Sequence, residues 1–229
     1  MSRVAENAGA EELPPVRLYM LQCGTLTCRT QDIWMNDPRN AEVTIPVPWF
    51  VLTHPAGHVV MDGGMSSECA VDPERYWGPI AKQFRPAMSP QDACERRLAA
   101  LGIAAEDVRY VVLSHLHLDH TGALGRFPNA TYVVRRAEYD YAHNPDWFAA
   151  SSYLLKEIDR RDLRWQFLDD GEDMVDLLGD GSLRLIATQA TRSGISRLSC
   201  DCRTPALSCS HRTPPTPCGT GMSRRCRGF

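Results

Sequence analysis

The segment Ser114–His120 constrains this chain more than any other, because it places three histidines and one aspartate within a few residues of each other. These residues are His115, His117, Asp119 and His120. Imidazole nitrogens and carboxylate oxygens are the ligands of zinc sites that stay open for water, whereas structural zinc sites are usually closed by thiolates. No cysteine lies near the segment. The pattern therefore predicts a metal site with an open coordination position.

The residues before this segment predict where the site lies. Val108–Leu113 is a β-branched and aromatic run that is typical of a buried strand, and a Thr-Gly turn follows the histidines. If the backbone stays extended through His115 and His117, their side chains share one face and can chelate a single ion. Asp119 and His120 come after the chain starts to turn, so they would face a neighbouring position. Two metal ions that share one water are the natural interpretation.

The other histidines and the early cysteines lack a ligand-like neighbour at chelating spacing. We expect the histidines to be ordinary surface or core residues and the cysteines to be buried or unreactive thiols. The histidines are His54, His58, His143 and His211, and the cysteines are Cys23, Cys28, Cys69 and Cys94.

Length and composition predict one soluble enzyme domain. The chain has 229 residues with 43% hydrophobic content, which is enough for one substantial core. We expect residues 1–15 to be a disordered N-terminal segment, without the pattern of a secretory signal. No apolar run approaches a membrane span, so we expect a cytoplasmic protein without a membrane partner. The sequence does not indicate an oligomeric state.

The order of elements predicts a layered α/β fold. Strands are expected near residues 163–168 and 183–187. Ser89 offers an N-cap, Pro90 stands at the first helical position and Gly102 supplies the stop, which predicts a helix between them. The aromatic-rich segment 138–162 is expected to be helical. Its aromatic rings could line an apolar pocket, although core packing is the favoured role.

Together these segments resemble a known family. Residues 115–120 match the His-x-His-x-Asp-His signature of the metallo-β-lactamase superfamily. Residues 16–21 resemble a first strand, and segment 46–64, with a strand at 46–52, is similar to the superfamily's hairpin that ends in an Asp-x-Gly corner. Segments 121–127 and 133–139 are similar to the N-acyl homoserine lactonase branch. The resemblance spans residues 16–188, which we take as the metallo-β-lactamase-like domain.

The resemblance implies an αββα sandwich with two zinc ions at the strand ends. His115 and His117, with one later histidine, would hold the first ion. Asp119 and His120, with a last histidine, would hold the second, and a later aspartate would bridge both. In the lactonase reaction, which opens a lactone ring by hydrolysis, Asp119 would also pass a proton to the ring oxygen that leaves the carbonyl carbon. Asp62 resembles an aspartate that orients the metal ligands, and a simple turn aspartate is the alternative.

The chain changes character after Thr188. Residues 189–229 hold seven Arg, one acidic residue and five of the nine Cys, with very few large apolar side chains, whereas residues 1–188 hold 18 basic and 27 acidic residues. Such a stretch cannot build a strand-and-helix layer. Its cysteine spacings match no paired-cysteine zinc pattern. A nucleic-acid role is disfavoured because the main domain is acidic.

The hypothesis that best explains this tail is that residues 189–229 are read out of frame. Codons chosen for Arg212–Gly221, shifted by one nucleotide, spell Asp-Ala-Ala-Tyr-Thr, which resembles the lactonase segment with the bridging aspartate and a substrate-polarising tyrosine. The same shift across Gln189–Leu198 permits a Gly-His-Thr-Val-Gly-His segment, similar to the one that carries the family's third zinc histidine. We therefore expect an incomplete sandwich whose second half is largely missing.

Three functions remain open from the sequence. The first is a zinc-dependent hydrolase that opens the lactone ring of N-acyl homoserine lactones, a quorum-quenching activity, impaired here by the lost ligands. The second is another hydrolase of the superfamily, such as a thioesterase of the glyoxalase II type. The third is a non-catalytic remnant.

Overall fold

The computed structural model describes residues 15–34, 36–169, 171, 174–186 and 198–199. Their backbone forms a seven-stranded sheet in the order β4-β1-β2-β3-β5-β6-β7 and a three-stranded sheet in the order β10-β9-β8. The large sheet consists of β1 (Arg17–Arg29), β2 (Glu42–Thr53), β3 (His58–Met61), β4 (Arg85–Ala87), β5 (Val108–Val112), β6 (Thr131–Arg135) and β7 (Arg164–Leu168). The small sheet consists of β8 (Met174–Asp176), β9 (Arg184–Ile186) and β10 (Leu198–Ser199).

Strand direction divides the large sheet into two parts. Strands β4, β1, β2 and β3 pair antiparallel, and β3, β5, β6 and β7 pair parallel. Strand β1 runs well past the segment expected from the sequence, with a bulge between Gln22 and Thr25 and a positive φ of 67° at Gly24. The parallel strands are short; most residues of β5 and β6 are buried, as is typical of parallel strands, whereas β7 at the sheet edge is mostly half-buried.

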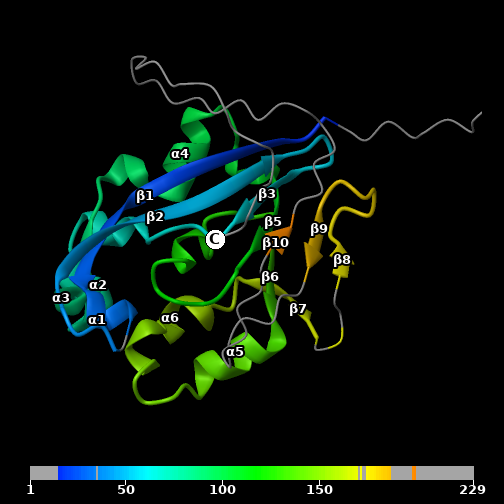
Figure 1. Cartoon of the computed structure of the whole chain (residues 1–229). Coiled ribbons are helices and arrows are strands. Elements are labelled where there is room, and N and C mark those ends of the chain that lie inside the picture. The colour runs from blue at the N-terminus through cyan, green and yellow to red at the C-terminus, as the bar shows by residue number, and fades with distance from the viewer. Residues whose placement is uncertain (1–14, 35, 170, 172–173, 187–197, 200–229) are drawn as a thin grey trace, which may run out of the picture.

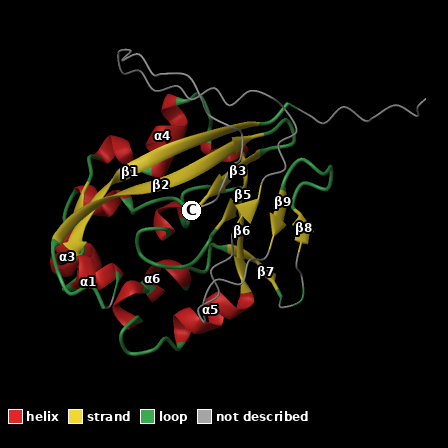
Figure 2. Cartoon of the chain, viewed as in Figure 1, coloured by secondary structure: helices red, strands yellow, loops and turns green. Residues whose placement is uncertain are grey.

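The helices are short and connect the strands (Figure 2). They are α1 (Thr30–Ile33), α2 (Pro73–Trp77), α3 (Ile80–Gln83), α4 (Cys94–Ala100), α5 (Arg136–His143) and α6 (Leu155–Ile158). Single 3₁₀ turns cover Ser67–Ala70, Pro90–Asp92, Ala105–Asp107, Thr121–Ala123 and Ala150–Ser152. No helix among the described residues is both long and apolar enough to cross a membrane.

Two sequence-based helix predictions need correction. The expected helix after Ser89 begins as a 3₁₀ turn, in which Asp92 accepts hydrogen bonds from the backbone and hydroxyl of Ser89, and α4 starts only at Cys94. The aromatic-rich segment 138–162 is not one helix: α5, a 3₁₀ turn and α6 are separated by irregular chain. Tyr153 is buried, which fits core packing, but Trp147 is 89% exposed and Phe148 is 57% exposed.

Two apolar clusters cover the two faces of the large sheet. The larger cluster joins the sheet to the helices, through side chains such as Trp77 of α2, Leu98 of α4 and Ile158 of α6. The smaller cluster joins the other face to the small sheet, through side chains such as Leu183 and Leu185. Figure 1 shows β8 and β9 beside the parallel strands, on the side away from α4 and α6. The described residues thus supply helices, a large sheet and a small sheet, as expected for an incomplete αββα sandwich.

The expectations for the two ends of the chain lie mostly outside the described residues. This holds for the predicted disordered segment 1–15, apart from its last residue, and for most of 189–229. Residues 198–199 are an exception, because they pair with Leu185 and Arg184 as β10. The expectation that residues 189–229 build no strand-and-helix layer stays a prediction, because most of this segment lies outside the described residues.

Candidate functional site

Parallel pairing of β3 and β5 assembles the candidate site. Both strands end at the same edge of the sheet, so Asp62, directly after β3, lies beside the loop that follows β5. Ligand-binding residues of α/β sheets commonly lie at this carboxyl edge. The loop runs from Ser114 to the 3₁₀ turn at Thr121–Ala123, and we call residues 114–121 the histidine loop.

The histidine loop brings its three imidazole rings together. The ring centroids of His115 and His117 are 4.5 Å apart, and those of His115 and His120 are 4.0 Å apart. Oδ2 of Asp119 is 3.5 Å from Nε2 of His120. The four residues singled out by the sequence therefore lie in one cluster.

Burial and neighbouring charges set the protonation of the imidazoles. Burial, together with the other two imidazoles, holds the pKa of His115 well below its ordinary value. Burial also lowers the pKa of His117. At His120 burial is outweighed by the carboxylates of Asp62 and Asp119, which raise its pKa to about 9. His115 and His117 are therefore neutral near pH 7, the form in which an imidazole binds a metal.

Asp62 holds the start of the histidine loop. Its Oδ1 accepts hydrogen bonds from the backbone N–H and the hydroxyl of Ser114, each at 2.8 Å. Its Oδ2 lies 3.1 Å from Nδ1 of His120. The backbone of Asp62 has a positive φ of 60°, and its N–H donates to the carbonyl of Val112. The carboxylate thus contacts the loop and not only its own turn.

Sequence reasoning missed two further carboxylates that contact the histidine loop. Glu138 of α5 accepts a hydrogen bond from the N–H of Leu116 at 2.9 Å. Glu157 of α6 accepts one from the hydroxyl of Thr121. Burial raises the pKa of both carboxyl groups. Glu138 follows directly after a buried strand, but nothing in its local sequence separates it, or Glu157, from an ordinary helix glutamate.

The donor types of the histidine loop fit a divalent metal, because imidazole and carboxylate are both zinc ligands. Among the described residues, however, no group of three or more His, Cys, Asp or Glu side chains has the arrangement needed to hold one ion. A catalytic zinc normally has three protein ligands. The histidine loop therefore supplies the right chemistry and only part of a ligand set.

The remaining histidines of the described chain have other partners. Nε2 of His54 lies 2.9 Å from Oδ2 of Asp180, and its Nδ1 accepts the N–H of Ala56. Nδ1 of His58 accepts the N–H of His54. His143 lies 2.7 Å from Oδ1 of Asp159. His211 is outside the described residues. Cys23, Cys28, Cys69 and Cys94 are buried free thiols, as expected, and burial raises the pKa of Cys23 to about 12.

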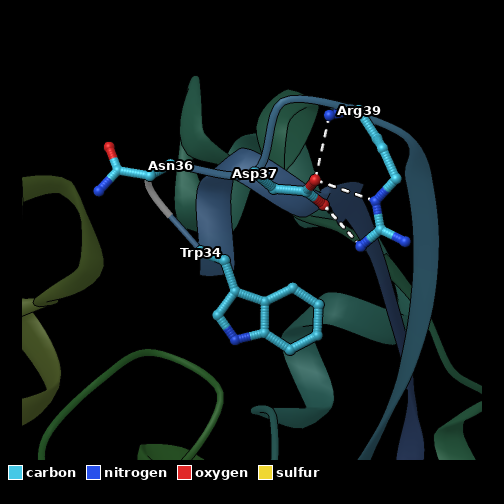
Figure 3. A pocket seen from close by; sticks show the side chains of 4 residues that line it. All are labelled: Trp34, Asn36, Asp37 and Arg39. Atoms are coloured by element: carbon cyan, nitrogen blue, oxygen red, sulfur yellow. Dashed lines mark hydrogen bonds and ion pairs between the residues drawn. The ribbon is translucent and has the colours of Figure 1, made fainter.

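A separate hollow lies beside α1. It has a volume of about 480 Å³ and is lined by Trp34, Asn36, Asp37 and Arg39 (Figure 3). Hydrogen bonds from Arg39 hold the pKa of Asp37 far below its ordinary value. None of these residues belongs to the histidine loop, and three of the four are polar. The hollow is therefore separate from the histidine loop and has a mostly polar lining.

Comparison with known proteins decides the family. The model of the metallo-beta-lactamase superfamily matches residues 44–201, more than half of the chain. The chain belongs to this superfamily. The match includes Asp62 and the whole histidine loop, and it extends beyond Thr188.

Within the superfamily the chain is similar to proteins named N-acyl homoserine lactonase AttM. It is 52% identical over 172 residues to the one from Azorhizobium caulinodans, covering 75% of this chain and 65% of the relative. It is 51% identical over 180 residues to the one from Agrobacterium fabrum, covering 78% of this chain and 68% of the relative. The chain therefore spans about two thirds of the length of these superfamily members.

A solved structure shows the same superfamily fold. It is an N-acyl homoserine lactone hydrolase with the product N-hexanoyl-L-homoserine at its catalytic metal centre. The TM-score is 0.65 at 22% sequence identity, and the match covers 79% of this chain and 68% of the solved one.

Proposed function

We propose that this chain is a metal-dependent hydrolase that opens the lactone ring of N-acyl homoserine lactones, a quorum-quenching activity. The observation that carries the proposal is the half-buried cluster of three imidazoles and Asp119 at the sheet edge, in a chain that is about half identical, over about three quarters of its length, to proteins named N-acyl homoserine lactonase AttM. The substrate would be a small molecule, and we propose a cytoplasmic location from the sequence alone.

We assign two zinc ions to the site. His115 and His117 would contribute to the first, and Asp119 and His120 to the second. When bound, zinc supplies a Lewis acid for the lactone carbonyl and lowers the pKa of water to about 7. The neutral imidazoles of His115 and His117 are ready to donate nitrogen lone pairs. His120 must lose the proton that Asp62 and Asp119 stabilise before its nitrogen can bind.

The proton on the leaving group is assigned to Asp119. The water that attacks the carbonyl must lose one proton and the former ring oxygen must gain one, and a carboxylate within hydrogen-bond reach of both could take up the first proton and pass it on. Asp62 holds the start of the loop that carries Asp119, through its hydrogen bonds with Ser114.

We also propose that residues 189–229 are read out of frame, so that the chain as written lacks its remaining ligands. Two ligands for each ion hold zinc less firmly than three. We therefore expect lactone turnover by the chain as written to be weak or absent. Resequencing the gene around the codons for Thr188 and Gln189 tests the frame directly, and an intact reading frame there would contradict this part of the proposal.

The activity is tested with long-chain N-acyl homoserine lactone and zinc, by following acid release with a pH indicator. The chain as written and a frame-restored chain are compared, each with its Asp119→Asn variant. The restored chain should open the lactone, and Asp119→Asn should lower kcat more than it raises KM, because an amide is a poorer ligand and cannot pass a proton. Restored protein that cleaves thioesters and leaves lactones intact would contradict the lactonase assignment and support the glyoxalase II type.

A further inference from the structure

Glu138 is a buried carboxylate below the histidine loop. It lies in α5, and its side chain is 1% exposed. Oε1 accepts hydrogen bonds from the N–H of Leu116 at 2.9 Å and from the hydroxyl of Tyr153 at 3.2 Å. Oε2 is buried and has no hydrogen-bond partner within the described part of the chain. A carboxyl group in this position is costly, so its retention needs a reason.

The backbone group that Glu138 contacts lies between two proposed metal ligands. Leu116 separates His115 from His117, and its own side chain is fully buried. A hydrogen bond at this amide therefore fixes the peptide unit between His115 and Leu116, which lies one residue before His117. A buried N–H without a partner would cost about 1–3 kcal/mol.

The same region holds the loop at two neighbouring points. His117 and Tyr153 form an isolated antiparallel β-bridge, and their rings pack edge to face with centroids 4.9 Å apart. The N–H of Leu118 donates to the carbonyl of Ser152 at 2.9 Å. Glu138 links these contacts, because Oε1 of Glu138 accepts hydrogen bonds both from the hydroxyl of Tyr153 and from the N–H of Leu116.

We propose that Glu138 is a positioning residue that sets the spacing of His115 and His117 through the amide of Leu116. The inference rests on the metal-binding role proposed for the two histidines and is independent of the lactone chemistry. The carbonyl oxygen of a neutral glutamine could accept the same two hydrogen bonds, whereas methionine fills a similar volume and accepts neither. The pair Glu138→Gln and Glu138→Met therefore separates hydrogen bonding from packing.

The first measurement is the affinity of the full chain for zinc, by competition with a chromophoric chelator. Glu138→Met should bind zinc about tenfold to hundredfold more weakly, the usual cost of losing a group that orients metal ligands. Glu138→Gln should stay close to the parent chain. Val108→Ala serves as the control. Val108 is a buried residue at the start of β5, whereas the histidine loop follows the other end of this strand, so its truncation should lower stability without changing zinc affinity.

The second measurement needs no metal. In ¹⁵N-edited NMR spectra of histidine side chains, Glu138→Met should move the ring signals of His115 and His117 towards those of the unfolded chain, and Glu138→Gln should preserve them. Three outcomes would overturn the proposal. The first is unchanged histidine ring signals in Glu138→Met, and the second is an equal loss of zinc affinity in Glu138→Met and Val108→Ala. The third is a loss of zinc affinity in Glu138→Gln as large as that in Glu138→Met. A parent chain that binds no zinc would agree with the proposed loss of ligands after residue 188, and the NMR comparison, which needs no metal, would then decide the role of Glu138.

Discussion

Three buried carboxylates hold the histidine loop, and each comes from a different element. Asp62 follows β3, Glu138 lies in α5 and Glu157 lies in α6. Their contacts on the loop are Ser114, Leu116 and Thr121, respectively. At the scale of single residues, the site thus depends on side chains that are not themselves proposed to touch the metal.

The contact between Asp62 and Ser114 should contribute to stability and to metal binding in separable ways. Asp62→Ala removes the acceptor for two Ser114 groups and should lower the free energy of unfolding by about 1–3 kcal/mol, measured in urea. Asp62→Asn can still accept through its carbonyl oxygen, so it should recover most of the stability. Asp62→Asn also removes the negative charge beside His120, however, so its zinc affinity should be about tenfold to hundredfold lower than that of the parent chain. Full recovery of affinity in Asp62→Asn would show that the charge plays no part.

The burial of Glu157 should make stability pH-dependent. Burial raises its folded pKa above the ordinary 4.5, against hydrogen bonds from Thr121 and Tyr76 that lower it. A group with a raised folded pKa stabilises the protein fully below its unfolded pKa and loses this contribution as the pH rises through its folded pKa. Relative to Glu157→Gln, which does not titrate, the unfolding free energy of the parent chain should therefore fall as the pH rises from about 4.5 to the folded pKa. Denaturant titrations across that range measure the difference, and a constant gap between the two proteins would contradict the expectation.

At the scale of elements, tight backbone contacts bring the strand ends together. The N–H of Gly122, just after the histidine loop, donates to the carbonyl of Gly64 at 2.8 Å. A Cβ at Gly122 would overlap the carbonyl groups of Met65 and Gly64. The chain therefore needs glycine here for close approach between the corner after β3 and the 3₁₀ turn.

Gly122→Ala should push these two segments apart. We expect a loss of about 1–3 kcal/mol in the free energy of unfolding, as in other overpacked sites, together with weaker zinc binding. Gly102→Ala is the matched control: Gly102 has a positive φ of 76° but no atom within 4 Å of an added Cβ, so only backbone strain is introduced. Thermal unfolding and chelator competition on both variants separate the two effects. Equal zinc affinity in the two variants would argue against a link between this contact and the site.

At the scale of the whole molecule, two apolar clusters stabilise opposite faces of the large sheet. The larger one packs the helices on one face of the large sheet and includes Leu116 of the histidine loop. The smaller one packs the small sheet on the opposite face, with Leu183 fully buried at its centre. The proposed metal ligands belong to neither cluster, so the small sheet contributes to stability more than to the site.

Leu183→Ala tests this division. Removing a buried leucine side chain should cost about 2–5 kcal/mol of unfolding free energy, because it leaves a cavity between the two sheets. Zinc affinity, measured under conditions where the variant is folded, should match that of the parent chain. Hydrogen exchange should show increased opening of β8 and β9, with the amides of β5 and β6 still protected. Loss of protection in β5 together with β9 would mean that the two sheets unfold as one unit.

The sequence by itself determined the parts of this protein that depend on local patterns. The apolar run before Ser114 predicts strand β5, and the alternating histidines that follow predict a metal-binding loop, because strand periodicity and ligand chemistry are both written in adjacent residues. Helix boundaries after Ser89 and across 138–162 were less predictable, because tertiary packing overrides capping signals in short segments.

Only the tertiary structure decided which distant residues support the loop. Glu138 and Glu157 are far from the histidines in sequence, and each is an ordinary glutamate until α5 and α6 fold against the ends of β5 and β6. Their hydrogen bonds to Leu116 and Thr121 arise from that packing. A local pattern records which atoms can bind a metal, whereas the groups that hold those atoms in place come together only when parallel strands and their connecting helices are assembled.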